Sequence, residues 1–124
     1  MGLENLRELH LAENHISDFS FLAGRSNLTT LNLDSNQLTD LNLPRVLSQL
    51  ATLSLDDNRL TNLTLPKKLN HLATLEVDGN QLTNLALSAG LTNLVTLSLS
   101  SNPLTDVSFL GGQTNQIGMI IGNF

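Results

Sequence analysis

The sequence contains no cysteine, tryptophan or tyrosine, and only 4 phenylalanines among its 124 residues. Without cysteine, no disulfide can stabilise the chain and no thiol can act as nucleophile or metal ligand. The apolar residues are mostly leucine, whereas globular cores usually combine side chains of several shapes to fill irregular space. This shortage of aromatic residues favours a core in which one layer is repeated.

Basic residues are also scarce: 6 Lys plus Arg stand against 11 Asp plus Glu, for a net charge of -5. Nucleic-acid binding needs a clustered basic surface and anionic lipid attracts a polybasic segment, so we expect neither partner. No apolar run is long enough for a membrane-spanning helix, so we expect no membrane insertion. The start, MGLENLREL, lacks the apolar segment of a signal peptide.

A repeat of 22 residues runs through the chain. Each copy begins with L-x-x-L-x-L-x-x-N, and the alternation within this pattern predicts a short strand. A period of this length is typical of a solenoid, whose turns cannot bury enough surface alone and must stabilise one another by stacking. We therefore expect one domain, residues 1–124. Its units are residues 6–27, 28–49, 50–71, 72–93 and 94–115, with a partial unit at 116–124.

This pattern resembles the leucine-rich repeat family, whose signature is the same nine residues followed by x-L. The last position of that signature is occupied by Ile16, Leu38, Leu60, Leu82 and Leu104. The resemblance covers residues 6–115 and implies a right-handed solenoid, of the α/β class by family but β-rich here. One parallel strand per repeat would form a sheet on the concave face.

The second half of each unit, such as LTNLTL in the third copy, also alternates. This predicts extended or short-turn segments on the convex face, β structure on both sides of the coil, and little or no helix. The pattern resembles the 22-residue subgroup of bacterial surface proteins such as the internalins.

The asparagine that ends the nine-residue pattern has a structural explanation. The backbone must bend after the strand, which leaves buried N–H and C=O groups to be paired. A carboxamide has two donors and an acceptor, so it can pair with backbone groups of its own turn and the next. We therefore predict a structural ladder of Asn14, Asn36, Asn58, Asn80 and Asn102.

The third, fifth and seventh positions of each unit are predicted to point outward, in columns about 4.8 Å apart. The resemblance implies that partners bind this concave face. The face lacks the Trp, Tyr and Arg that anchor most protein interfaces, so we expect a weak or polar interface. The candidate protein-binding residues are Thr30, Asn32, Asp34, Thr52, Ser54, Asp56, Thr74, Glu76, Asp78, Thr96 and Ser98.

The acidic residues of this face allow a second hypothesis. Asp34, Asp56, Asp57, Asp78 and Glu76 could offer oxygen ligands to calcium, which takes six to eight. The competing interpretation, which we favour, is a solvated column whose repulsion is screened by salt.

Two further groups recur. A regular column of hydroxyl residues could indicate ice binding, although threonine also simply favours strands. Its members are Ser17, Thr39, Thr61, Thr83 and Thr105. The basic residues Arg45, Lys67 and Lys68 lie away from the aspartates. They could orient stacking between molecules, but a solvated surface is the favoured interpretation.

The last residues, QIGMIIGNF, begin a sixth unit with Gln116 in place of the leading leucine. Met119 and Ile121 fit the strand positions of that unit. Either the chain is a piece of a longer solenoid, or its apolar end packs on another chain. The second interpretation predicts a homo-oligomer that associates through Met119, Ile121 and Phe124.

No pattern predicts catalysis, a cofactor or a recurrent metal site. The histidines His10, His15 and His71 occupy three different repeat positions, and no nucleophile elbow or phosphate-binding loop is present. The sequence thus predicts a non-enzymatic protein-interaction or spacer module of a larger leucine-rich repeat protein, with a partner that it does not identify. The alternative is a structural unit that self-assembles through its ends. The resemblance favours an extracellular or bacterial cell-surface location over the cytoplasm.

Overall fold

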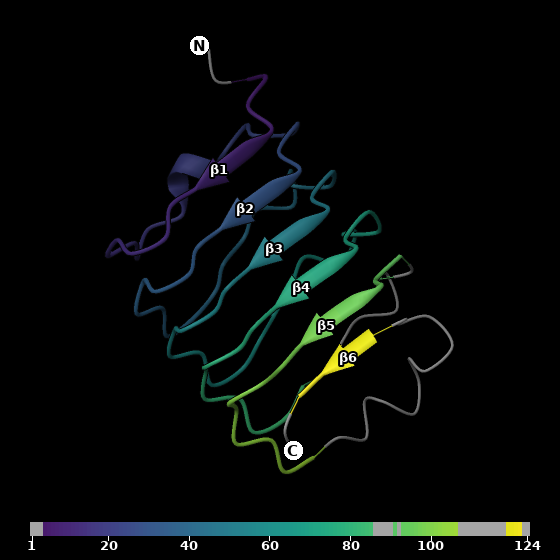
Figure 1. Cartoon of the computed structure of the whole chain (residues 1–124). Coiled ribbons are helices and arrows are strands. Elements are labelled where there is room, and N and C mark those ends of the chain that lie inside the picture. The colour runs from purple at the N-terminus through teal and green to yellow at the C-terminus, as the bar shows by residue number, and fades with distance from the viewer. Residues whose placement is uncertain (1–3, 86–90, 92, 107–118, 123–124) are drawn as a thin grey trace.

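A computed structural model describes residues 4–85, 91, 93–106 and 119–122, without the side chains of 119–121. Within these residues six short strands form one parallel sheet in chain order, from β1 to β6 (Figure 1). The strands are β1 (Glu8–His10), β2 (Thr30–Asn32), β3 (Thr52–Ser54), β4 (Thr74–Glu76), β5 (Thr96–Ser98) and β6 (Met119–Ile121). One strand per repeat confirms the predicted parallel solenoid.

The register follows the repeat. From β1 to β5, each residue pairs with the one 22 positions later, as Leu31 pairs with Leu53. The last step is 23 residues, because Leu97 pairs with Ile120. The constant period had predicted Met119 opposite Leu97, so that register was wrong by one residue. The sixth unit has Gln116 where the other units have the leucine that fixes their spacing.

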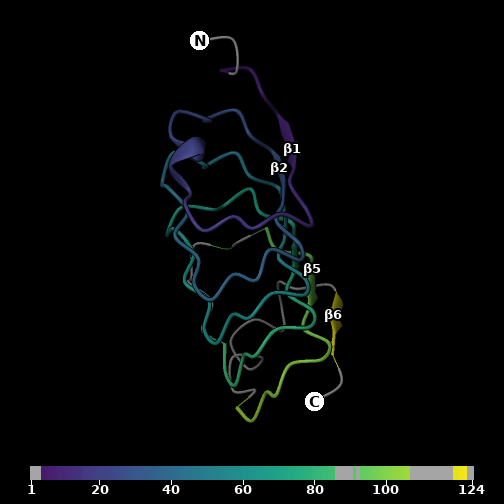
Figure 2. The same ribbon diagram turned by 90° about the vertical axis from the view of Figure 1, so that its left-hand side faces the viewer.

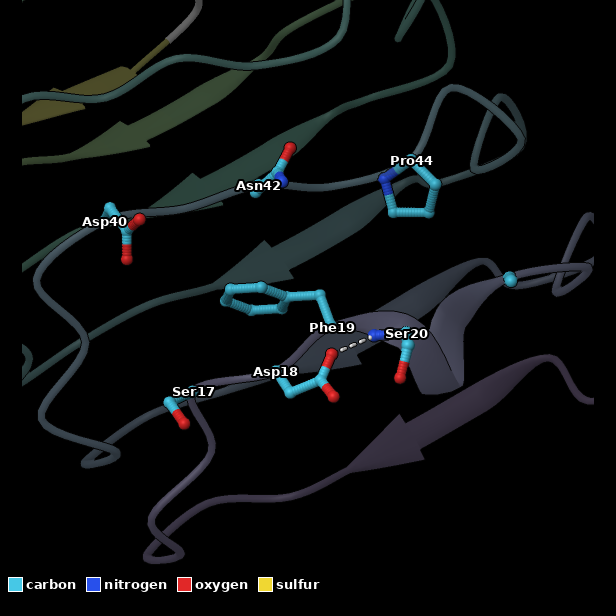
Figure 3. A pocket seen from close by; sticks show the side chains of 8 residues that line it. Ser17, Asp18, Phe19, Ser20, Asp40, Asn42 and Pro44 are labelled. Carbon is cyan, nitrogen blue, oxygen red and sulfur yellow. Dashed lines mark hydrogen bonds between the residues drawn. The ribbon is translucent and has the colours of Figure 1, made fainter.

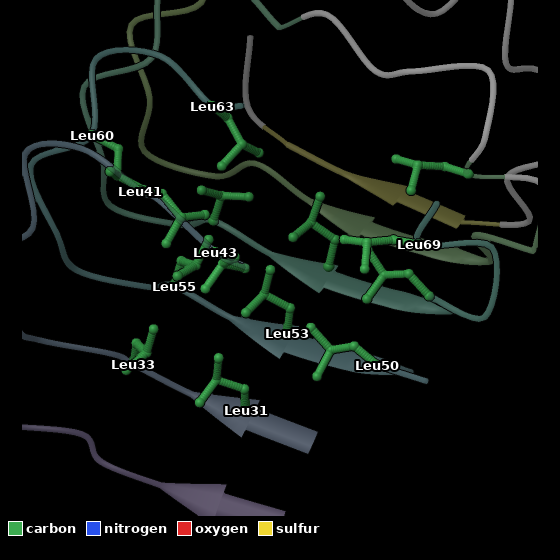
Figure 4. Packing of buried hydrophobic residues seen from close by; sticks show 14 of the residues in the cluster. Leu31, Leu33, Leu41, Leu43, Leu50, Leu53, Leu55, Leu60, Leu63 and Leu69 are labelled. Carbon is green, nitrogen blue, oxygen red and sulfur yellow. The ribbon is translucent and has the colours of Figure 1, made fainter. Parts of the chain in front are cut away.

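Leucines fill the space between the sheet and the opposite side of the coil (Figure 4). Each turn contributes side chains from its strand and from its second half, so successive turns add nearly identical layers. The third turn supplies Leu50, Leu53, Leu55, Leu60, Leu63 and Leu69, none more than 9% exposed. Burying one leucine stabilises the fold by about 1.5–3 kcal/mol.

The side of the coil opposite the sheet, which we call the back, is extended (Figure 2). Its only helix in the described residues is the 3-10 helix η1 (Ser20–Leu22). Neighbouring back segments share isolated backbone hydrogen bonds, such as Arg59 N–H to Leu38 O at 2.8 Å. Extended segments with little helix are therefore confirmed. The expected β structure on the back does not form in the described residues, because these isolated bonds do not build a ladder. No described helix is long and apolar enough to cross a membrane.

The ninth-position asparagines join the turns. Asn58 is 6% exposed. Its Nδ2 donates to Leu33 O of the preceding turn at 3.0 Å and also to carbonyls of its own turn. Its Oδ1 accepts the N–H of Leu38, also in the preceding turn, at 2.9 Å. The predicted ladder thus exists, but each carboxamide reaches the preceding turn rather than the next. Both kinds of bond recur at Asn36, Asn80 and Asn102.

The eighth position of every unit takes a left-handed backbone conformation, with φ between 55° and 66°. This conformation turns the chain out of the sheet, and it favours glycine because a Cβ crowds the following carbonyl. Only one unit has glycine there, so the repeat pattern did not predict this bend. The residues are Glu13, Ser35, Asp57, Gly79 and Ser101.

Candidate functional site

The third, fifth and seventh positions of the strands lie in register across the sheet, on the side away from the leucine core. We call this surface the sheet face; it is the surface that the sequence predicted as concave. Strand pairing sets Thr30, Thr52, Thr74 and Thr96 in one column. All four threonines are half-buried. The next column contains Asn32, Ser54, Glu76 and Ser98.

The seventh-position aspartates form a second ladder, which the sequence did not predict. Asp34 Oδ1 accepts the backbone N–H of Asp56 at 2.7 Å, and Asp56 Oδ1 accepts that of Asp78 at 2.7 Å. Asp78 Oδ1 accepts the N–H of Ser100 at 2.8 Å. Each carboxylate therefore takes up a backbone donor of the following turn.

The beginning of this ladder follows from one residue. The first turn has Ala12 at the seventh position, so it offers no carboxylate to the N–H of Asp34. That N–H instead donates to Asn32 Oδ1 within its own turn at 2.9 Å. The backbone donor is satisfied in either way, as the burial of this region requires.

Hydroxyl groups tie the aspartates to the neighbouring column. Ser98 Oγ donates to Asp78 Oδ1 at 2.6 Å. Ser54 Oγ lies 2.6 Å from Asp34 Oδ1 and 3.1 Å from Glu76 Oε2, and its single proton can serve one of them at a time. Both serines are only 6% exposed. The surface that a partner could touch is therefore supplied mainly by the threonines and carboxylates.

Burial raises the pKa of Asp56 from 3.8 to about 6. The negative charges of Asp34, Asp78 and Glu76 raise it further, while the hydrogen bond from the N–H of Asp78 opposes the shift. The sheet face thus holds a carboxylate that gains a proton just below neutral pH.

The calcium hypothesis gains no support from the geometry. In the described part of the chain, no three His, Asp or Glu side chains are grouped so that they could hold a metal ion. The aspartate oxygens described above instead accept protein donors.

The hydroxyl column of the ice-binding hypothesis is exposed throughout. It runs along the turns that leave the sheet, and Thr105 Oγ1 donates to Thr83 O at 3.3 Å. Its members are Ser17, Thr39, Thr61, Thr83 and Thr105.

A hollow of about 500 Å³ opens on the back of the first two turns (Figure 3). Phe19 lies in it beside Asp18, whose Oδ1 accepts the N–H of Ser20 at 2.9 Å. No motif predicted this hollow, although ISDFSF in the first unit departs from the LTDLNL of the second. Its lining consists of Ser17, Asp18, Phe19, Ser20, Ala23, Asp40, Asn42 and Pro44.

A second hollow, of about 460 Å³, brings together Arg45, Lys67 and Lys68. The repeat pattern groups these residues but does not predict a cavity between them. For the predicted self-association residues, only the backbone of Met119 and Ile121 is described, and Phe124 lies outside the described residues. That association stays a prediction.

Comparison with known proteins gives a consistent result. Residues 4–45 match the family model "Leucine Rich repeats (2 copies)" and residues 90–108 match "Leucine Rich repeat". No curated protein matches the chain.

Two solved internalin structures from Listeria monocytogenes are similar to almost the whole chain. An internalin (inlF) is 33% identical over 98% of this chain, with a TM-score of 0.78. Internalin C2 (inlC2) is 30% identical over 98% of this chain, with a TM-score of 0.66. The chain spans 35% and 64% of those two proteins, respectively.

Proposed function

Since this chain is a leucine-rich repeat protein of the internalin-like type, we propose that it is a non-enzymatic module that binds a protein partner through its sheet face. The observation that carries the proposal is the aspartate ladder. Its carboxylates are held by hydrogen bonds from the next turn, as in the pair of Asp34 and Asp56. Side chains that are ordered before binding lose less entropy when a partner arrives.

The charge of the face defines the chemistry of the partner. Asp34, Asp56, Asp78 and Glu76 lie on adjacent strands, and no Arg is among the candidate binding residues. A partner that presents Lys or Arg side chains would complement this surface. Such pairing speeds association and suppresses unsuitable partners, and it weakens as salt is added.

Site-specific photo-crosslinking tests the proposal. A benzophenone amino acid would replace Thr74 on the sheet face or, as a matched control, the exposed Thr61. Both proteins would be incubated with extracellular and cell-surface proteins and then irradiated. We expect a discrete crosslinked protein from position 74 and none from position 61. Crosslinking from position 61 alone, or from neither, would contradict the proposal; the second result would favour a spacer role.

The partner identified in this way allows a test of the charge argument. Glu76→Lys should weaken its binding by about tenfold or more, because it places a like charge against the basic partner. Gln81→Lys adds a positive charge at an exposed position outside the sheet face and should leave the affinity within about twofold.

A further inference from the structure

The second hollow collects an unusual share of the positive charge of this acidic protein. Arg45, Lys67 and Lys68 line it together with Ser48 and Pro66. These are three of the six Lys and Arg residues in the chain, and no carboxylate is among the lining residues. We call this hollow the basic pocket.

The repeat itself sets two of these cations side by side. Arg45 and Lys67 occupy the same position of consecutive units, directly after Pro44 and Pro66. Stacking of the turns therefore places one above the other. Both belong to the turns that return the chain from the back to the sheet.

The turns that carry these cations are anchored in the core. Leu47 is fully buried and its N–H donates to Pro44 O at 3.3 Å. Leu69, its counterpart in the next turn, is 1% exposed. The pocket floor is thus fixed, whereas the cationic side chains on its rim are free to adjust to a ligand.

The charges of these three cations are not neutralised by the protein around them. Across the described residues, no Asp or Glu forms an ion pair with Arg45, Lys67 or Lys68. Adjacent like charges repel, and an anion placed between them would remove that repulsion. A guanidinium binds two oxygens of one oxyanion in its planar fork, and ammonium groups add adjustable point charges.

We propose that the basic pocket binds a small ligand carrying closely spaced sulfate or phosphate groups. The volume of about 460 Å³ lies within the range of small-molecule sites and admits a ligand of disaccharide size. The pocket lies at the turns that precede β3 and β4, whereas the aspartates follow the strands. It is therefore separate from the sheet face, and the module can hold the anion and the protein partner at the same time.

Nuclear magnetic resonance titration of the full chain tests this proposal. The probes are inorganic pyrophosphate and a disulfated disaccharide, with the unsulfated disaccharide as control, at low ionic strength. We expect saturable shifts of the amides of Ser48 and Lys68 with at least one anionic probe and none with the neutral sugar. Tighter binding of pyrophosphate would assign a phosphate ligand, and tighter binding of the sulfated sugar a sulfated one.

Charge-neutral variants complete the test. Arg45→Gln and Lys67→Gln should each weaken binding about two- to fivefold, because each removes an exposed charged contact. Arg59→Gln removes the same charge at an exposed position outside the pocket and should leave the affinity unchanged. The absence of saturable shifts with both anions, or an equal loss in all three variants, would overturn the proposal.

Discussion

The carboxylate of Asp34 accepts the backbone N–H of Asp56, one turn further along the coil, at 2.7 Å. A charged side chain therefore satisfies the backbone where the strand leaves the sheet. The same bond joins Asp56 to Asp78. This arrangement orders the carboxylates of the sheet face and removes them partly from water, which has consequences for stability and for its dependence on pH.

The first prediction concerns Asp56. Its pKa is about 6 in the folded protein against 3.8 ordinarily, so between these values the folded state binds the proton more tightly than the unfolded chain. Stability from this group therefore rises as the pH falls from about 6 to about 4 and is lost again as the pH rises. Because the carboxyl is partly exposed and screened, we expect a change of only about 1 kcal/mol.

The variant Asp56→Asn isolates this effect. Its amide oxygen can still accept the N–H of Asp78, but it does not titrate. In urea unfolding we expect the variant to exceed the wild type in stability at pH 7.5 and to match it near pH 4. Asp40→Asn, at an exposed position on the back, should follow the wild-type profile in this range. A difference between Asp56→Asn and wild type that does not vary with pH would refute the explanation.

The second prediction concerns the buried hydroxyl of Ser54, which donates toward the carboxylates of Asp34 and Glu76. Ser54→Ala leaves these part-buried carboxylates with one donor fewer and should cost about 1.5–3 kcal/mol. The exposed Ser26→Ala should cost less than about 0.5 kcal/mol. Urea unfolding at pH 7.5 measures both. Equal stability of the two variants would show that the hydroxyl contributes nothing to the ladder.

The third prediction uses the left-handed eighth position. Gly79→Ala should lower the free energy of unfolding by about 1–2 kcal/mol, because alanine tolerates a φ of 66° poorly. The new Cβ would also meet the carboxylate of Asp57. Ser35→Gly should instead raise stability by about 0.5 kcal/mol, since relief of the same strain slightly exceeds the entropy that glycine loses. Thermal unfolding that shows both variants destabilised equally would contradict this assignment.

The sequence was sufficient for those features that the repeat states five times. Each copy shows the same alternation, so strand positions and core residues such as Leu53 and Leu55 follow from the pattern alone. The ninth-position asparagines were explained by backbone groups that the bend must leave unpaired. Prediction failed where a unit departs from the pattern, since Gln116 does not fix the spacing of β6.

The remaining features depend on contacts between turns that a linear pattern does not encode. Asp34 was interpreted as a solvated charge, because nothing in the sequence shows that its oxygen reaches the N–H of Asp56. Ser54 was assigned to the exposed face but is covered by its neighbours. The convergence of Arg45 and Lys67 on a hollow depends on the path of two turns, although their equal repeat positions indicated that they would be adjacent.

The central claim is that buried bonds between neighbouring turns hold the coil together and thereby fix the sheet face. Comparison of Asn58→Ala with Asn14→Ala in urea unfolding tests it most directly. Asn58 is buried and bonded to the preceding turn, whereas Asn14 is exposed and its Nδ2 donates only within its own turn. Asn58→Ala leaves Leu33 O and Leu38 N–H without the carboxamide, so we expect a loss of about 3 kcal/mol or more, against less than about 1 kcal/mol for Asn14→Ala. Equal losses in the two variants would contradict the claim.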